Sequence, residues 1–145
     1  MNDQSAKDIE KQKKRYLKRY RNNIACIKRL EAKRDDLEYK LNSLRSANIS
    51  GMPRGGVPVT EADMIADKAD LEARIERLTA KGRRLKNDVY AAIDTLEDPR
   101  HCEVLESFYI ECLSMEEIAE KMNYTERHIH ALFQEAISFT SISLQ

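Results

Sequence analysis

The chain has 145 residues, of which 34% are charged and 6% aromatic, with four glycines, three prolines and no tryptophan. This length fits one domain, or one small domain with a long extension. The composition excludes collagen-like, glycine-rich and disulfide-dense classes, and an all-β sandwich would require more β-branched residues and more frequent turns. No apolar run approaches the roughly 18 residues of a membrane span, and the first residues lack the apolar stretch of a secretory signal.

The three cysteines, Cys26, Cys102 and Cys112, are odd in number and widely spaced. This pattern favours reduced thiols in a cytoplasmic protein over a disulfide framework or a metal-binding knuckle. His128 and His130 are two residues apart and would point to different faces of a helix, so we expect no metal site and no cofactor. The sequence shows no serine–histidine–aspartate pattern and no phosphate-binding glycine loop, so we do not expect an enzyme.

The formal net charge is zero, but the charge is unevenly distributed along the chain. Residues 1–50 carry a net charge of +7, residues 51–100 of −1 and residues 101–145 of −6. A basic segment can meet phosphates, whereas an acidic segment cannot do so on charge alone. The alternative is that both ends are solvated helix faces, or that they attract each other within the protein.

Residues 7–46 contain no glycine or proline and carry mostly apolar residues at alternating steps of four and three, which is the seam of a coiled coil. Residues 61–96 carry a second seam of the same period. Residues 47–60, between them, hold three of the four glycines and two of the three prolines and therefore predict a loop. The two seams comprise Ile9, Lys13, Tyr16, Tyr20, Asn23, Ile27, Leu30, Arg34, Leu37, Leu41 and Leu44, and Met64, Lys68, Leu71, Ile75, Leu78, Gly82, Leu85, Val89, Ala92 and Leu96.

Two seams of equal period joined by a short loop predict a long antiparallel helical hairpin, a coiled coil, over residues 1–97. Folding about residue 54 places Gly82 at the level of Ile27. Asn23 is then the polar seam residue that fixes the register. A parallel homodimer through the same seams is the alternative, and the Gly/Pro loop between matched lengths favours the hairpin.

The remaining residues, 98–145, predict a C-terminal module of three short helices in an all-α protein. Asp98 and Pro99 open the first helix, because aspartate caps a first turn and proline lacks the N–H that a helix start leaves unpaired. We expect this helix to end near Leu113. Residues from Ser138 onward are rich in serine and threonine and are expected to fray.

The second and third of these helices have the sequence features of a helix-turn-helix. Ser114 and Glu117 form a capping box that begins the second helix. Asn123 would end that helix in the left-handed conformation that asparagine tolerates best after glycine. Ala119 is the small residue expected where the two helices cross, and Thr125 caps the third helix.

The third helix predicts a recognition helix for double-stranded DNA, because its outward-facing residues near the N-terminus would reach base edges in a major groove. Arg127 suits guanine O6 and N7, Glu126 a cytosine amine, and Gln134 adenine or a phosphate. A three-helix packing module without DNA contact is the alternative. The expected DNA-binding residues are Thr125, Glu126, Arg127, His130, Ala131 and Gln134.

Residues 98–137, with the sequence Leu-Ser-Met-Glu-Glu-Ile-Ala-Glu-Lys-Met-Asn-Tyr-Thr-Glu-Arg at their centre, resemble the C-terminal helix-turn-helix of sigma factors, their region four. With the long hairpin and the sequence Met-Pro-Arg-Gly-Gly at residues 52–56, the whole chain resembles small phage and prophage proteins of Gram-positive bacteria that are similar to the ArpU and RinA late-gene transcriptional regulators. The resemblance implies a sequence-specific transcriptional regulator or sigma-like factor that acts through DNA and RNA polymerase. It places the recognition helix at Thr125–Ile137.

The basic N-terminal segment is the expected source of affinity for DNA phosphates, because the C-terminal module is net acidic. The expected phosphate contacts are Lys11, Lys14, Arg15, Lys18 and Arg21. In the hairpin this segment lies beside the junction with the helix-turn-helix, so both would meet one duplex. The alternative function is a coiled-coil adaptor whose helix-turn-helix tail binds protein rather than DNA, and the sequence leaves a homodimer open.

Overall fold

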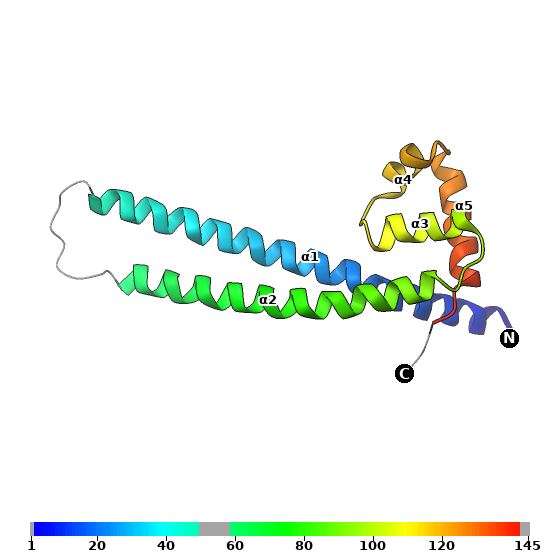
Figure 1. Cartoon of the computed structure of the whole chain (residues 1–145), viewed down its shortest axis with the longest axis horizontal. Coiled ribbons are helices and arrows are strands. Elements are labelled where there is room, and N and C mark those ends of the chain that lie inside the picture. The colour runs from blue at the N-terminus through cyan, green and yellow to red at the C-terminus, as the bar shows by residue number, and fades with distance from the viewer. Residues whose placement is uncertain (1, 50–58, 143–145) are drawn as a thin grey trace. The chain divides into compact units, whose positions relative to one another are not determined.

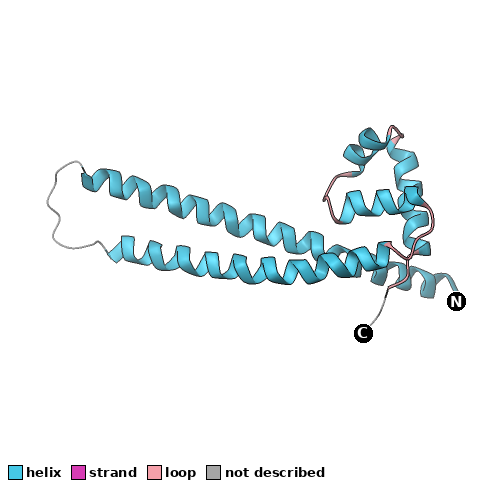
Figure 2. Ribbon diagram, viewed as in Figure 1, coloured by secondary structure: helices cyan, strands magenta, loops and turns pink. Residues whose placement is uncertain are grey.

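The computed structural model describes residues 2–49 and 59–142, and the regular secondary structure in these ranges is entirely helical (Figures 1 and 2). The predicted all-α class is therefore confirmed. Most of the predicted loop at residues 47–60 lies outside the described residues. The helices are α1 (Asn2–Ile49), α2 (Val59–Ile93), α3 (Pro99–Tyr109), α4 (Met115–Met122) and α5 (Glu126–Phe139).

Two compact units make up the chain, one formed by residues 1–23 with 82–145 and the other by residues 24–81. The first unit, which we call the module unit, combines the beginning of α1 and the end of α2 with α3, α4 and α5. The second, which we call the hairpin unit, contains only α1 and α2. The domain boundary predicted between residues 97 and 98 stays a prediction. In the module unit, the beginning of α1 and the end of α2, which precede this boundary, pack with the helices that follow it.

The predicted antiparallel hairpin is confirmed within each unit by ion pairs between α1 and α2. In the hairpin unit, Lys68 Nζ lies 3.8 Å from Glu38 Oε1. In the module unit, Arg19 Nη2 lies 3.1 Å from Asp88 Oδ2. Within the hairpin unit, Arg45 Nε also lies 3.6 Å from Glu61 Oε1, so the partner numbers on α1 fall as those on α2 rise, and only an antiparallel arrangement produces this pattern.

The predicted register of the hairpin is wrong by about one helical step at Gly82. The heavy atoms nearest to a Cβ placed on Gly82 belong to Asn23 and Tyr20, with Asn23 Oδ1 at 2.7 Å, whereas the predicted neighbour was Ile27. Asn23 is buried at the seam, as expected. Periodicity determines which side chains face the partner helix, but it leaves the axial register open, because sliding by one seam step preserves the pattern.

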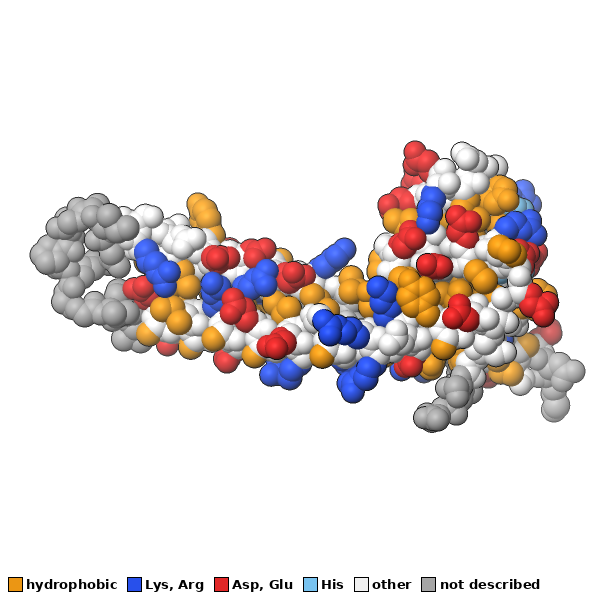
Figure 3. Space-filling view, in the orientation of Figure 1, with side chains coloured by type: hydrophobic (Ala, Val, Ile, Leu, Met, Phe, Trp, Pro, Cys, Tyr) orange, Lys and Arg blue, Asp and Glu red, His pale blue; other side chains and the backbone are white. Residues whose placement is uncertain are grey.

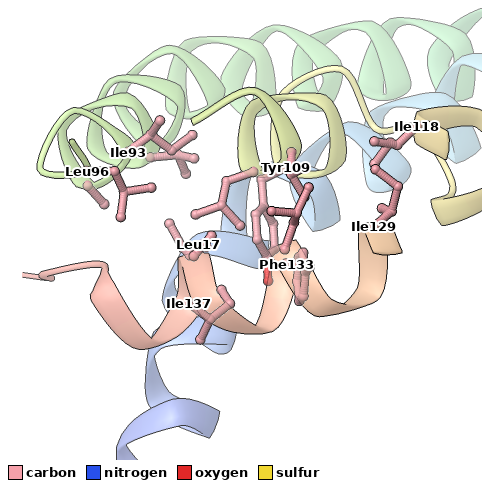
Figure 4. Close-up of a cluster of buried hydrophobic side chains, with 14 of the residues drawn as sticks. Leu17, Ile93, Leu96, Tyr109, Ile118, Ile129, Phe133 and Ile137 are labelled. Carbon is pink, nitrogen blue, oxygen red and sulfur yellow. The ribbon is translucent and has the colours of Figure 1, made fainter. Parts of the chain in front are cut away.

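A single hydrophobic core fills the module unit (Figure 4). Leu17 of α1 is fully buried in this core, although the predicted seam omits it, and Ile9, which the seam includes, is 50% exposed. A seam of period 3.5 describes contact with one partner helix, whereas this part of α1 packs against both α2 and the three-helix module. The core residues labelled in Figure 4 are Leu17, Ile93, Leu96, Tyr109, Ile118, Ile129, Phe133 and Ile137.

The three-helix module begins as expected, with the Asp98 side chain capping α3 and Pro99 in the first turn. Helix α3 is shorter than predicted: it ends at Tyr109, whereas the sequence predicted an end near Leu113. Cys112 then takes a φ of 60°, in the left-handed region that the sequence did not predict for this residue. This turn redirects the chain into α4.

The expectation that the chain frays from Ser138 onward is wrong for the described residues. Helix α5 continues to Phe139, and Thr140 is buried, with its hydroxyl donating to the Ala136 carbonyl at 2.6 Å. The backbone N–H of Ser141 donates to Thr95 Oγ1 at 3.2 Å, which ties the segment to the end of α2. A tertiary partner thus compensates for poor local propensity.

Candidate nucleic-acid interface

Helices α4 and α5 are joined by a tight turn at residues 123–125. Ser114 Oγ accepts from the Glu117 N–H at 3.1 Å, and Glu117 Oε1 accepts from the Ser114 N–H at 3.2 Å, so the capping box is present. Asn123 ends α4 with φ 58° and ψ 41°, in the left-handed conformation. Thr125 Oγ1 accepts from the His128 N–H at 3.1 Å and caps α5. These local predictions are all confirmed.

We expect Ser114→Ala to lower the free energy of unfolding by about 1 kcal/mol, because the N–H of Glu117 loses its acceptor in the first turn of α4. Urea denaturation followed by circular dichroism measures the change. Ser114→Asp is the matched control and should keep most of the stability, since aspartate caps a helix as well as serine does. An equal loss in both variants would contradict a stabilising role for this cap.

The six predicted DNA-binding residues, Thr125, Glu126, Arg127, His130, Ala131 and Gln134, are all exposed. Glu126 Oε1 lies 3.7 Å from His130 Nε2, one turn along α5. The Gln134 amide donates a hydrogen bond to the carboxylate of Glu10 in α1. Within the described part of the chain, Arg127 makes no ion pair or hydrogen bond. It is therefore the cation of α5 that is available to an external partner.

Sequence reasoning missed two side chains beside the start of α5, Arg100 and Tyr124. Arg100 Nη2 donates to Asp98 Oδ2 at 3.1 Å, and these hydrogen bonds hold the pKa of Asp98 below its usual range. The pKa of Arg100 is raised by Asp98 and, to a smaller extent, by Tyr124. The Tyr124 ring packs edge-on against His128, with 4.6 Å between centroids. The sequence indicated the place of Tyr124 beside the start of α5, because this residue lies between the turn residue Asn123 and the cap residue Thr125.

Two basic residues near the start of α1, Lys13 and Arg19, bind groups on the neighbouring helices α5 and α2. Lys13 Nζ donates to the carbonyls of Ile137 and Ser138, at 3.3 and 3.1 Å, at the C-terminal end of α5. A cation at this end satisfies carbonyls that have no partner within the helix and suits the negative end of the helix dipole. Arg19 is bound to Asp88 of α2. These two cations therefore stabilise the packing of α1.

Arg21, an expected phosphate contact, lies among protein acceptors in the structure. Its Nη1 donates to the carbonyls of Phe108 and Leu113, at 2.8 and 3.2 Å, and its guanidinium carbon lies 4.1 Å from the centre of the Phe108 ring. These contacts hold the turn after α3 against α1. The guanidinium is half-buried and already hydrogen-bonded, so its observed role is structural.

Three other expected phosphate contacts, Lys11, Arg15 and Lys18, are exposed and follow one another at steps of four and three along α1. We call them the basic stripe of α1. In the described ranges none of them has an ion pair or hydrogen bond. Lys14, the remaining expected contact, is half-buried, with Nζ 3.5 Å from Glu10 Oε1 and 5.9 Å from the centre of the Phe133 ring.

Residues of α1 that neighbour the basic stripe contact α5 within the module unit. The Gln134 amide donates a hydrogen bond to the Glu10 carboxylate. The ammonium group of Lys14 lies near the Phe133 ring of α5. Lys11 directly follows Glu10 along α1, and Arg15 directly follows Lys14.

Helices α3 and α4 present the opposite charge. Figure 3 shows acidic side chains spread over the viewed face of these helices. Lys121 does not offset them, because its ammonium group donates to Ser107 Oγ at 3.0 Å and to Glu111 Oε2 at 3.0 Å. The acidic residues of α3, of α4 and of the turn between them are Glu103, Glu106, Glu111, Glu116, Glu117 and Glu120, of which all but the half-buried Glu106 are exposed. The module unit is thus polarised, with α3 and α4 negative and the basic stripe of α1 positive.

The cysteines and histidines do not gather into a metal site. Over residues 2–49 and 59–142, no three side chains of His, Cys, Asp or Glu are placed to hold a metal ion. His101 is buried, with Nε2 3.1 Å from Glu135 Oε2 and its ring stacked on Phe139. It links the first turn of α3 to the last turns of α5, which is a structural role. In the same ranges, no helix has the length and apolar character that a membrane span requires.

The chain is an all-α protein in which an antiparallel helical hairpin is followed by three short helices with capped starts. The chain belongs to the family described as "Protein of unknown function (DUF1492)", whose family model matches residues 43–140. The match spans α2 to α5 and leaves out the basic stripe of α1. No curated protein and no solved structure matches the chain.

Proposed function

We propose that this protein is a DNA-binding transcriptional regulator of the phage type, in which α5 is the recognition helix. The observation that carries the proposal is the exposed, unpaired Arg127 in the first turn of a helix that is capped and positioned as in a helix-turn-helix. Residues at this end of such a helix reach base edges in the major groove. Arginine is suited to guanine because it donates to O6 and N7 together.

The basic stripe of α1 supplies the phosphate contacts in this proposal. Its three cations are exposed and have no ion pair or hydrogen bond among the described residues, and two of them directly follow the α1 residues Glu10 and Lys14 that contact α5. Phosphate contacts position a protein on the duplex, and base contacts then select the sequence. In this arrangement the acidic surface of α3 and α4 binds a partner protein, and we propose that this partner is RNA polymerase.

The same acidic surface supports a second candidate function, a coiled-coil adaptor that binds protein only. DNA binding measured at several salt concentrations separates the two functions. A DNA-binding protein releases counterions, so its affinity falls steeply with salt. An adaptor would bind no duplex at low salt and would select no sequence from a random pool.

We expect Arg127→Ala to weaken binding to a selected DNA site by about 1–3 kcal/mol and to relax the preference at one base position. Selection from a random duplex pool, followed by titration of the selected site, measures both effects. Arg83→Ala removes an exposed arginine from α2 and is the control for net charge. An unchanged preference in the Arg127 variant would remove α5 from the role of recognition helix.

A further inference from the structure

The two edges of the hairpin unit differ in whether their charged side chains form ion pairs between α1 and α2. On one edge, ion pairs connect α1 to α2: Lys68 Nζ lies 3.8 Å from Glu38 Oε1, and Arg45 Nε lies 3.6 Å from Glu61 Oε1. These pairs flank the seam and fasten the two helices to each other. The charges on this edge are therefore used within the chain.

On the opposite edge, α2 carries a row of six charged residues at alternating steps of four and three, the spacing of one face of a coiled-coil helix. All six are exposed, and none has an ion pair or hydrogen bond within the described residues. The first three are acidic and the last three are basic. The row, which we call the charged row of α2, consists of Asp63, Asp67, Asp70, Arg74, Arg77 and Lys81.

The charged row borders a groove in the hairpin unit. Leu37 of α1 and Leu71 of α2 line this groove of about 390 Å³, together with Lys33 and Asp36 of α1 and with Asp67, Asp70 and Arg74 of the row. Both leucines are seam residues, yet both stay half-exposed. Two helices alone cover only part of each apolar stripe, so further burial of these side chains is favourable.

We propose that a second copy of this chain packs against this edge, antiparallel to the first, with the two-fold axis at the level of residue 72. Under that symmetry the acidic half of one row faces the basic half of the other, and Asp70 meets Arg74 while Asp67 meets Arg77. A two-fold contact must be self-complementary, because the same surface is used by both copies. A parallel arrangement would place acid against acid and base against base. This inference goes beyond the proposed function and does not depend on DNA binding.

Charge reversal in the full-length chain tests the proposal by sedimentation and light scattering across the micromolar range. The wild-type chain should show twice the mass of one chain, 16.8 kDa. The variants D67K/D70K and R74E/R77E should each be monomeric, because each places like charges opposite one another where positions 67 and 70 of one copy meet positions 77 and 74 of the other. An equimolar mixture of the two should restore a 1:1 dimer, and the variant carrying all four changes should dimerise alone.

The matched control is E72K/E76K, which reverses two exposed acids on α2 outside the charged row. It should remain dimeric. A monomeric wild-type chain would overturn the proposal, as would a dimer that survives both row reversals. Monomeric variants that stay apart when mixed, with helical circular dichroism retained, would overturn it as well, because complementary rows would then have failed to pair.

Discussion

Leu17→Ala is expected to lower the free energy of unfolding of the module unit by about 2–5 kcal/mol, the usual cost of truncating a fully buried leucine. Leu17 has no exposed surface and lies in the core that includes Val89 of α2 and Ile137 of α5. Its truncation leaves a cavity where α1, α2 and the three-helix module meet. The loss should therefore destabilise the docking of all these elements together.

Thermal and urea unfolding, followed by circular dichroism, measure this loss. Ile9→Ala is the matched control on the same helix, since Ile9 is 50% exposed, and its effect should stay within about 0.5 kcal/mol. Equal stabilities of the Leu17 variant and the wild type would show that α1 does not belong to the core of the module unit. Equal losses in the two variants would contradict a special role of Leu17 in the core, because alanine has a higher helix propensity than either residue and the loss at Ile9 could not come from the helix itself.

Replacing Lys11, Arg15 and Lys18 together by glutamine is expected to reduce the slope of log affinity against log salt by about 2.7 for duplex DNA. Each phosphate that a protein neutralises contributes roughly 0.9 to this slope, and each residue of the basic stripe is proposed to neutralise one. The affinity at low salt should fall accordingly, while the sequence preference at the base contacted by Arg127 should remain. Fluorescence anisotropy at several salt concentrations measures the slope.

The control for this prediction replaces Lys28, Arg83 and Arg84 by glutamine. These residues are exposed and lie outside the basic stripe, so the change in net charge is the same. An equal reduction in both triple variants would assign the effect to net charge. An unchanged slope in the stripe variant would mean that DNA does not contact α1, and the affinity would then have to come from α5 and its neighbours.

The local features of the three-helix module could be predicted because each depends on residues a few positions apart. Asp98 caps α3, Ser114 forms a capping box with Glu117, and Asn123 takes the left-handed turn. Such contacts form between a side chain and the nearest backbone groups, and the residue types that can make them are few. The starts and ends of these short helices were therefore determined by the sequence down to their individual caps.

The amphipathic period of α1 and α2 was equally determined by the sequence, and it predicted an antiparallel hairpin. The axial register at Gly82 was not, because neighbouring seam steps are nearly equivalent until side-chain size selects one. The charged row of α2 is also present in the sequence. Only the packing shows that this row has no ion pair or hydrogen bond among the described residues, whereas the other edge is joined by ion pairs such as Lys68 with Glu38.

Only the tertiary structure decided how the basic residues of α1 divide between internal and external roles. Lys13 and Arg21 meet carbonyls of α5 and of the turn after α3, whereas Lys11, Arg15 and Lys18 face outward. Their acceptors lie about ninety or more positions away in the chain, at helix ends whose positions depend on how the module docks. Charge and helical period specify where a side chain points on its own helix, but the partner it finds depends on contacts between distant segments.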